Sequence, residues 1–564
     1  MIWALKNPLR YAREVAALEA LAVSTEGLRI GPIAPNGKGQ LAAEIELEVR
    51  DRLFEGSLTY PQSFPNVPPI VAPREKEHWS GHQYGGGGEF CLEWGPDNWG
   101  PELTGADMVG SAVKLLRTEG GLPGTPAADV DTRHSTTIGQ QARHENMRLI
   151  CTPLLETALG ELESDAEGTY AARYGGRLWR LFVTGMTADA SGLEWADVSI
   201  PLPFVEASVA LKGRVLRVEN LPDLEGSASD VRTRLLGAPA PEGAEDEVVL
   251  CVDPRGRIAA VYLYHEQETA HPLLVIRPGS QGRRLEADPE GLSAKRVGIV
   301  GCGSLGSKVA ASLARSGVRR FLLIDDDLLL GENIVRHDLD WNDVGLHKVD
   351  SVQGRLRRIA PDIDIGIRRH RLGGQEASGA LDSVVDDLAR TDLIIEATAD
   401  ARAFNYASAA AAKVPMIWAE VFGGGYGGMI ARARPGLDPA PQKARALIET
   451  WCAARDRPPP VSGTRYDGLV RDEPMVADDA AVGVIASHAT AMALDILAGL
   501  TPSRFPRSAY MIGLANEWIF EAPFDTWPID LGEAAPAVSE VDYSSPEVLE
   551  ALHHLVDVVE NAKA

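Results

Sequence analysis

The sequence predicts a multidomain protein in which two α+β regions precede a parallel α/β region. Residues 1–125 show the order helix, antiparallel strands, glycine-rich loop and helix, which indicates an α+β domain. Residues 126–285 hold strand-like runs beside a helical one, which indicates a second α+β domain. Over residues 286–564, apolar strands alternate with helices, and that alternation is typical of a parallel sheet. A chain of 564 residues is long enough for three such domains.

The composition restricts the classes of function. Hydrophobic residues make up 45% and charged residues 24% of the chain, and the net charge is −25. This acidic balance argues against binding to nucleic acid or to an anionic membrane. Five cysteines without paired spacing indicate neither a disulfide framework nor a zinc site, so we expect a cytoplasmic protein. The charged N-terminus is unlike a signal peptide, and no run approaches the ~20 apolar residues of a membrane span.

The elements of the first domain follow from local patterns. Apolar positions at helical spacing predict an amphipathic helix over 8–23. The runs GLRIGPIA, LAAEIELEVR and FEGSLTYP are separated by turn residues and predict strands. A proline-rich stretch, FPNVPPIVAP, and a glycine-rich loop, YGGGGEF, then lead to Cys91. A second helix is predicted over 106–120.

The middle domain carries weaker signals. A helix is predicted over 142–162, and strands are predicted over 179–187 and 209–219. The run EDEVVLCVDPRGRIAAVYLYHE predicts a hairpin around its PRG turn. No group of residues in this domain suggests catalysis, so we expect a linker or docking domain.

A glycine-rich loop predicts a nucleotide site in the third domain. Gly301, Gly303 and Gly306 follow an apolar strand and open a helix, which is the context that a GxGxxG motif requires. Glycines allow backbone amides to approach phosphate closely, and the helix N-terminus adds partial positive charge. Asp325 ends the next predicted strand, about 20 residues past Gly306, where an acidic residue binds ribose. Alone, these features suggest a dinucleotide-dependent dehydrogenase.

The segment after Asp325 favours a different chemistry. It contains four further polar residues of interest, namely Asp327, Asn333, Arg336 and Lys348. A dehydrogenase has no need for the last three, whereas arginine and lysine can neutralise charge at the α-phosphate of ATP and on the leaving pyrophosphate. Asp400 stands just past another predicted strand and is a candidate ligand for Mg²⁺.

Residues 296–435 resemble the adenylation domain of the ubiquitin-activating family, of the ThiF and MoeB type. The resemblance rests on the glycine loop, the aspartate-rich strand end and the spacing of Asn333, Arg336 and Lys348. It implies that these three residues contact the phosphates of ATP. It further implies that Asp325, at the strand end, binds ribose and that Asp400, in the ATAD run, holds Mg²⁺.

The same resemblance implies a partner and an assembly. In this family, the C-terminal carboxylate of a small protein attacks the α-phosphate of ATP. Members often form homodimers, in which an arginine near the start of the domain reaches the other active site. Arg283 or Arg284 stands at that place in this chain.

Cys91 lies in a stretch that resembles the catalytic region of the ubiquitin-conjugating fold. The residues that carry this resemblance are Tyr60, Pro61, Pro68, Pro69, Gly88, Cys91, Leu92, Trp99, Pro101, Leu103 and Thr104. The resemblance implies that Cys91 accepts an acyl group, since a thiolate is a good nucleophile and a good leaving group. Without this context, a cysteine between apolar neighbours is most simply a small buried hydrophobe.

The residues that support the conjugating cysteine depart from the family pattern. That family usually carries His-Pro-Asn upstream, whereas this chain reads Gly81, His82 and Gln83, with Gln83 at the asparagine position. A glutamine amide can donate a similar hydrogen bond to an oxyanion. Alternatively, His82 or His78 helps to deprotonate the attacking amine.

A second acyl-carrying cysteine is expected on a long loop between the runs GGMIARARPG and VGVIASHAT. The loop holds Cys452, and Arg455 and Arg457 nearby are placed to lower its pKa. The alternative is a buried cysteine at helical spacing from Leu447. Structural roles are expected for the remaining cysteines, which are Cys151, Cys251 and Cys302.

Together, the two resemblances make the chain similar to bacterial fusions of ubiquitin-activating and ubiquitin-conjugating enzymes, such as those of CBASS antiphage operons. They imply ATP and Mg²⁺ as cofactors. They also imply a ubiquitin-like protein or a cGAS-like nucleotidyltransferase with a free C-terminus as the partner, whose acyl group passes through Cys452 and Cys91 to target-protein lysines. The alternatives are a sulfur-carrier-type adenylyltransferase, a non-catalytic nucleotide-binding scaffold and, more distantly, a dehydrogenase.

Overall fold

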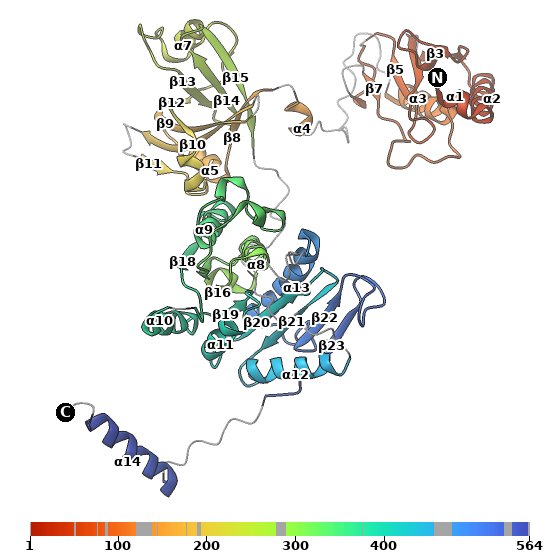
Figure 1. The fold of residues 1–564 in the computed structure, drawn as a ribbon. Helices are drawn as coiled ribbons and strands as arrows, with labels where there is room; N and C mark the ends of the chain where they lie inside the picture. Colours follow the sequence, from red (N-terminus) through yellow and green to blue (C-terminus); the bar gives the residue numbers. More distant parts are fainter. Residues whose placement is uncertain are drawn as a thin grey trace. The chain divides into compact units, whose positions relative to one another are not determined.

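Figure 1 shows the fold of the chain in a computed structural model. The structure describes residues 2–49, 52–75, 77–84, 88–119, 138–143, 145–175, 178–188, 193–277, 289–374, 376–455, 477–534 and 544–561. The chain divides into two compact units, Met1–His144 and Glu145–Ala564.

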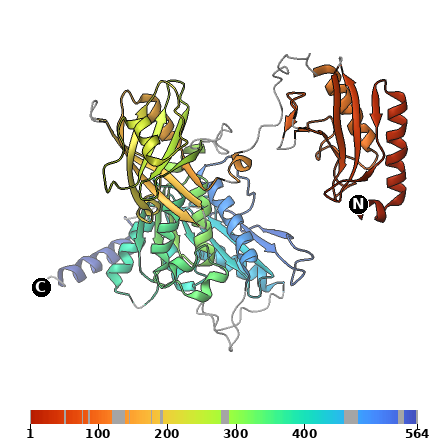
Figure 2. The same ribbon diagram turned by 90° about the horizontal axis from the view of Figure 1, so that it is seen from above.

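The first unit is an antiparallel sheet with helices packed on it. The strand order is β1–β3–β4–β5, with β2 paired to β3. Alternate side chains of β3 are buried, so one face of the sheet forms the core. Helix α2 lies alongside the sheet (Figure 2) and contacts α3 and β1. The elements are α1 (Ile2–Lys6), α2 (Pro8–Ser24), β1 (Leu28–Ile30), β2 (Ala34–Pro35), β3 (Leu41–Val49), β4 (Arg52–Tyr60), β5 (Ile70–Pro73), β6 (Gln83–Tyr84), β7 (Glu89–Phe90), α3 (Gly105–Glu119) and α4 (Ile138–Gln141).

A buried ion pair fixes the chain at the start of α3. The Arg10 Nε donates to Glu14 Oε1 at 2.8 Å, and the Tyr60 hydroxyl donates to Glu14 Oε2 at 2.9 Å. The same oxygen accepts the backbone N–H of Gly105 at 2.6 Å, and Arg10 Nη1 donates to the carbonyl of Pro101 at 2.5 Å. These contacts join α2, β4 and the loop before α3. The predicted order of helix, antiparallel strands and helix is confirmed, while the ubiquitin-conjugating likeness of this unit stays a prediction.

The middle region is a second, mostly antiparallel sheet. Its strand order is β11–β10–β8–β15–β14–β13–β12–β9, and a further pairing of β9 with β10 closes it into a ring. The predicted hairpin is confirmed as β13 and β14, which pair antiparallel. The elements are β8 (Met147–Ile150), α5 (Pro153–Glu161), β9 (Ala166–Gly175), β10 (Leu178–Ala188), β11 (Leu193–Ala196), α6 (Leu202–Glu206), β12 (Val209–Arg217), α7 (Ala228–Leu236), β13 (Glu247–Val252), β14 (Ile258–Tyr264) and β15 (Thr269–Ile276).

The single helix predicted over 142–162 is wrong, because the segment divides into β8 and α5. β8 pairs in parallel with both β10 and β15, which buries Leu149 completely. The helix begins only after it, where Pro153 takes the first helical position. The Thr152 hydroxyl caps the helix by accepting the N–H of Leu155 at 3.0 Å.

The C-terminal region contains the predicted parallel α/β sheet. The strand order is β18–β17–β16–β19–β20–β21–β22–β23, in which the strands from β18 to β20 run parallel and the last three are antiparallel. The strand order reverses between β16 and β19, which is where ligands bind in open α/β sheets. The strands are β16 (Arg296–Val300), β17 (Arg320–Ile324), β18 (Asp364–Arg368), β19 (Leu393–Glu396), β20 (Met416–Val421), β21 (Gly427–Ala433), β22 (Ala509–Gly513) and β23 (Thr526–Ile529).

Helices cover this sheet. They are α8 (Ser304–Arg315), α9 (Lys348–Ile359), α10 (Ser378–Leu388), α11 (Ala401–Ala410), α12 (Pro441–Ala453) and α13 (Asp479–Leu497), with the 3₁₀ helices η1 (Pro289–Ala294), η2 (Gly331–Val335) and η3 (Trp341–Asp343). By length and hydropathy alone, α13 could cross a membrane, but more than half of it is buried, and it packs against α8, β20 and β21. It is therefore placed as a core helix of this domain.

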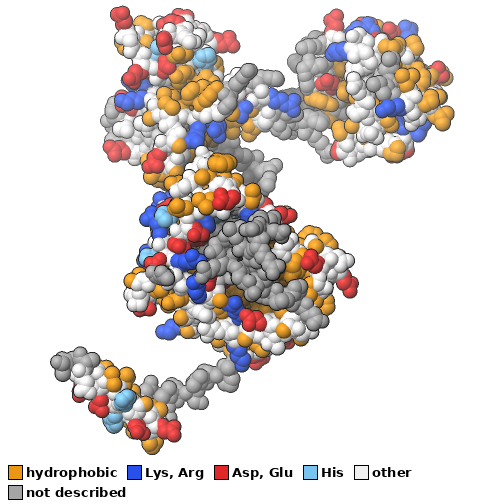
Figure 3. Space-filling model, viewed as in Figure 1, with side chains coloured by type: hydrophobic (Ala, Val, Ile, Leu, Met, Phe, Trp, Pro, Cys, Tyr) orange, Lys and Arg blue, Asp and Glu red, His pale blue; other side chains and the backbone are white. Residues whose placement is uncertain are grey.

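Two further features concern the end of the chain. The run EWIFEAP forms no strand, because the backbone turns at Trp518, whose φ is 58°, and Phe520 packs against Gly513. The C-terminal helix α14 (Pro546–Asn561) has no buried residue. Most of its leucine and valine side chains lie exposed among acidic ones, as Figure 3 shows.

Candidate functional site

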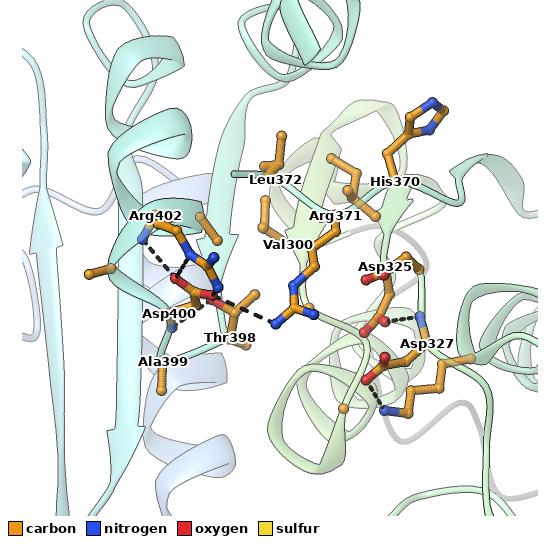
Figure 4. Close-up of a pocket in the computed structure, with 18 of the residues that line it drawn as sticks. Val300, Asp325, Asp327, His370, Arg371, Leu372, Thr398, Ala399, Asp400 and Arg402 are labelled. Atoms are coloured by element: carbon orange, nitrogen blue, oxygen red, sulfur yellow. Dashed lines mark hydrogen bonds and ion pairs between the residues drawn. The ribbon is translucent and has the colours of Figure 1, made fainter. Parts of the chain in front are cut away.

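A pocket of about 530 Å³ opens at the carboxyl ends of β16, β17, β18 and β19 (Figure 4). Because parallel strands end at the same edge of the sheet, the turns that follow them converge there. Of the residues predicted to bind nucleotide or metal, those that line it are Gly301, Gly303, Asp325, Asp327, Lys348 and Asp400.

The glycine loop has the geometry that a phosphate cradle requires. Gly301 has φ of 88°, and its N–H donates to the carbonyl of Ile324 at 2.9 Å. A Cβ on Gly306 would lie 1.9 Å from the Gly301 oxygen, so only glycine fits there. Helix α8 follows with Gly303 as its N-cap and with no side-chain cap. The first amides of α8 are thus available to an anion in the pocket.

Asp325 ties the end of β17 to this loop. Its Oδ2 accepts the N–H of Cys302 at 2.7 Å, and its Oδ1 accepts the N–H of Asp327 at 2.9 Å. Burial raises the pKa of Asp325, while the nearby Lys348 ammonium lowers it. The carboxylate therefore holds the loop in shape and also faces the pocket.

Lys348 balances the acidic end of β17. Its Nζ lies 2.8 Å from Asp327 Oδ2, and its side chain is 12% exposed. Carboxylate oxygens of Asp325, Asp326 and Asp327 all lie within 4.8 Å of one another. Oxygen ligands of this kind suit Mg²⁺, so the donor set beside Lys348 is chemically compatible with a nucleotide-bound cation.

Asp400 lies on the opposite side of the pocket and is already paired. It caps α11 and accepts two hydrogen bonds from the Arg402 guanidinium, at 2.7 and 3.2 Å. Arg371 reaches from the segment after β18 toward the same carboxylate, at 4.0 Å (Figure 4). The bond from Arg402 is the main cause that lowers the pKa of Asp400. Its predicted role as a Mg²⁺ ligand stays a prediction and would require at least one arginine to move.

Asn333 and Arg336 do not line the pocket. Both lie at η2, where Asn333 Oδ1 accepts the N–H of Leu330 at 2.9 Å and so shapes its own turn. Gly306 also stands behind the loop, on α8, where it allows close packing. The predicted phosphate contacts of Asn333 and Arg336 therefore stay predictions.

Sequence reasoning missed several residues of the pocket. Besides Arg371 and Arg402, the pocket is lined by His370 and Arg445. Glu396 lies behind it at the end of β19, where Oε1 accepts the N–H of Thr398 at 2.8 Å and also its hydroxyl. Burial raises the pKa of Glu396 to about 7. Most of these residues follow or end a predicted strand, and that position was the signal available in the sequence.

Comparison with known proteins decides the family of this region. The pocket and the strands from β16 to β21 lie within residues 284–512, which match the ThiF family. Residues 284–512 therefore form a ThiF-type domain. The parallel sheet, the glycine loop and the acidic end of β17 are therefore features of a ThiF domain.

Individual relatives match shorter parts of the chain. The ATP-dependent ubiquitin transferase-like protein Cap2 of Enterobacter hormaechei is 42% identical over 71 residues, which is 13% of this chain and 12% of that protein. The sulfur carrier protein ThiS adenylyltransferase of Escherichia coli is 31% identical over 143 residues, which is 25% of this chain and 53% of that protein. The crystal structure of E. coli MccB with ATP is 18% identical, with a TM-score of 0.33, and covers 44% of this chain and 67% of that one. The match spans 19% or less of Cap2 proteins and of protein y4qC of Sinorhizobium fredii.

Outside the ThiF domain, Cys91 lies directly after strand β7 of the first unit. All five cysteines lie within the described residues, and Cys91 is the one that is partly exposed rather than buried. It follows β7, and its N–H donates to the carbonyl of His82 at 2.7 Å. Trp99 fixes the loop beyond it by donating from Nε1 to the carbonyl of Pro65 at 2.8 Å. The buried-hydrophobe interpretation of Cys91 is thus weakened.

The Gln83 amide is engaged in the loop that precedes Cys91. Its Oε1 accepts the N–H groups of Trp79 at 2.5 Å and Ser80 at 3.0 Å. Its Nε2 donates to the carbonyls of Glu77 at 2.9 Å and Gly88 at 3.2 Å. Donation to an oxyanion would require one of the Nε2 bonds to break, so that role of Gln83 stays a prediction. His82 is partly exposed next to it, and its role likewise stays a prediction.

The expectation that Cys452 lies on a crossing loop is wrong. Cys452 belongs to α12 of the ThiF domain and is 4% exposed, in the core cluster that also contains Ala444 and Ile448. Helical spacing from these apolar residues turns its thiol inward. The guanidinium of Arg455 lies over the Trp451 ring, 3.8 Å from the ring centroid. Residues 456–476 of the predicted loop, which include Arg457, lie outside the described residues, as do Arg283 and Arg284.

The other three cysteines are buried. Burial raises the pKa of Cys151 to about 12 and that of Cys251 to about 11. Burial also raises the pKa of Cys302, beside Asp325. Their thiols are therefore protonated near neutral pH, as a structural role requires.

Proposed function

We propose that this protein uses ATP to activate the C-terminal carboxylate of a partner protein and transfers the acyl group to an amine through Cys91. The observation that carries the proposal is the pocket of the ThiF domain, in which an uncapped helix N-terminus, Asp325 and Lys348 surround one cavity. Relatives named as an ATP-dependent ubiquitin transferase-like protein and as a sulfur carrier adenylyltransferase support the first half of this reaction.

The activation step has a defined balance of bonds. A carboxylate oxygen of the partner attacks the α-phosphorus of ATP, and the bond to the bridging oxygen breaks, so that pyrophosphate leaves with the electron pair. The amides of α8 and the Lys348 ammonium stabilise the charge that develops on these phosphates. Asp325 orients the ribose. Asp325, Asp326 and Asp327 would hold Mg²⁺ through their carboxylate oxygens, and the ion would supply positive charge against the leaving pyrophosphate.

The acyl group then moves to sulfur and from sulfur to nitrogen. The Cys91 thiolate attacks the acyl carbon, and AMP leaves. A lysine amine of the target attacks the thioester, loses a proton and displaces the Cys91 thiolate. Passage through Cys452 requires α12 to open, since that thiol is buried, whereas Cys91 is already accessible.

The partner, the setting and the assembly belong to the same proposal. The carboxylate is that of a ubiquitin-like protein or of a cGAS-like nucleotidyltransferase, and the conjugation serves antiphage defence in the cytoplasm. The likeness to proteins named as ATP-dependent ubiquitin transferase-like Cap2 supports a ubiquitin-like partner. The ThiF domain forms a homodimer, and neither nucleic acid nor a membrane takes part, in keeping with a net charge of −25.

The test looks for a covalent adduct between the chain and its partner that requires ATP and the thiol of Cys91. The full chain is incubated with ATP, Mg²⁺ and each candidate partner, and samples run on gels with and without thiol. The proposal predicts a band that thiol removes and that is absent in Cys91→Ala. In Cys91→Ser the band should become resistant to thiol, because an oxyester replaces the thioester. The same band in Cys91→Ala contradicts the proposal, and the band in Cys452→Ala decides whether that residue takes part.

A sulfur-carrier-type adenylyltransferase is the second candidate, and the match to the ThiS adenylyltransferase favours it. It predicts AMP release with a partner, no thioester on Cys91 and a thiocarboxylate at the partner's C-terminus. Mass spectrometry of the partner separates the two functions. Absence of both AMP release and adducts, with every partner tried, favours a non-catalytic scaffold.

A further inference from the structure

The backbone of Cys302 in the glycine loop is held at both its N–H and its carbonyl group. Its N–H donates to Asp325 Oδ2 at 2.7 Å, and its carbonyl oxygen lies 2.9 Å from Nε2 of His337. His337 comes directly after Arg336, far along the sequence from the loop, and it is 7% exposed. Three segments therefore meet at one residue: the glycine loop, the end of β17 and the turn that carries Asn333.

The protonation state of His337 follows from this contact. A carbonyl oxygen only accepts hydrogen bonds, so Nε2 must carry the proton and donate it. Burial lowers the pKa of His337 to about 4, and the nearby ammonium groups of Lys348 and Lys308 act in the same direction, whereas Asp338 opposes them. The ring is therefore neutral at physiological pH. Its Nδ1 has no hydrogen-bond partner among the described residues.

The backbone of His337 ties the same residue to the neighbouring turn. Its N–H donates to the carbonyl of Asn333 at 3.1 Å, and the N–H of Arg336 donates to that carbonyl at 3.2 Å. One residue thus contacts the phosphate-binding loop through its ring and the Asn333–Arg336 turn through its backbone. A buried imidazole with one unsatisfied nitrogen is a poor choice for filling space, because an apolar side chain would avoid that cost.

We propose that His337 is a positioning residue of the nucleotide site: its ring fixes the orientation of the peptide between Cys302 and Gly303, so that the following amides of α8 face the phosphates of ATP. This inference rests on the proposed function, because it assigns His337 a role in binding ATP. It acts through the glycine loop and not by contact with the nucleotide, since His337 does not line the pocket.

Three substitutions separate positioning from packing. His337→Gln keeps an N–H donor at the reach of Nε2, and His337→Met has nearly the same length without a donor. His337→Asn has a donor that stops at the position of Nδ1 and cannot reach the Cys302 carbonyl. The readouts on the full chain are the dissociation constant for ATP with Mg²⁺, the KM for ATP and for a partner, and the thermal midpoint.

We expect His337→Met and His337→Asn to weaken ATP binding by about three- to tenfold, the effect of one lost hydrogen bond, and His337→Gln to stay within about twofold. The KM for ATP should rise while the KM for the partner does not. Equal losses in the Gln and Met variants, or losses that follow the thermal midpoint alone, overturn the inference. If the wild-type protein does not bind ATP, the proposed function is overturned. If the wild-type protein binds ATP and the His337→Met and His337→Asn variants bind it equally well, only this inference is overturned. If Met does not fold, the comparison of Gln with Asn decides.

Discussion

Substitution of Glu396 by glutamine should stabilise the ThiF domain at alkaline pH. Glu396 is 3% exposed, and burial raises its pKa from 4.5 to about 7. The folded protein thus binds a proton that the unfolded chain releases between these two values, and its stability falls as pH rises through that window. The penalty of holding the ionised carboxylate above pH 7 is about 3 kcal/mol, from 1.36 kcal/mol for each pKa unit. Glutamine keeps an oxygen that can accept from Thr398 and carries no charge.

The assay is urea denaturation of both proteins between about pH 5.5 and 8.5, away from the isoelectric point near 5.0. The advantage of Glu396→Gln should grow by about 2 kcal/mol across this range, because part of the penalty is already present at the lower limit. Glu396→Ala is the control, since it removes both the charge and the bonds to Thr398. An advantage that does not change with pH, or that shrinks as pH rises, would refute the reasoning.

Two further predictions concern other parts of the chain. Gly306→Ala should lower the thermal midpoint and abolish ATP binding, because its Cβ would lie 1.9 Å from the Gly301 oxygen. Gly303 lines the pocket, and a Cβ there meets no atom within 4 Å. Gly303→Ala should therefore weaken ATP binding and leave the thermal midpoint unchanged. Equal midpoints for both variants would contradict this account. Tyr60→Phe should destabilise the first unit by about 1 kcal/mol through loss of its bond to Glu14. ATP binding should not change, and a change there would show that the effect is not confined to that unit.

The parallel sheet could be predicted because its signals are local and redundant. The apolar runs that form β16, β17 and β19 alternate with helices, and a glycine loop marks the first turn. Because parallel strands end at one edge of the sheet, the positions of Asp325 and Asp400 just past two such strands were enough to place both residues there. The middle region lacked such redundancy: four residues form β8 and are stabilised by pairing with strands far along the chain, which no local pattern reveals.

The orientation of side chains could not be predicted in the same way. Arg371 and Arg402 converge on Asp400 because the turn after β18 packs closely on α11; a Cβ on Gly373 would lie 2.4 Å from that of Arg402. Such an approach depends on tertiary packing and not on spacing. Cys452 shows a second kind of error: the segment that contains it looked like a long loop in the sequence, but Cys452 lies on the inward face of helix α12.

The central claim is that the ThiF domain activates a carboxylate at the α-phosphate of ATP. Exchange of labelled pyrophosphate into ATP, measured with the full chain and each candidate partner, tests it most directly. The account predicts exchange that depends on the partner's free C-terminus, persists in Cys91→Ala and falls by at least about tenfold in Lys348→Ala. Exchange that is unchanged in Lys348→Ala, or a thioester formed on Cys91 without any exchange, would contradict it.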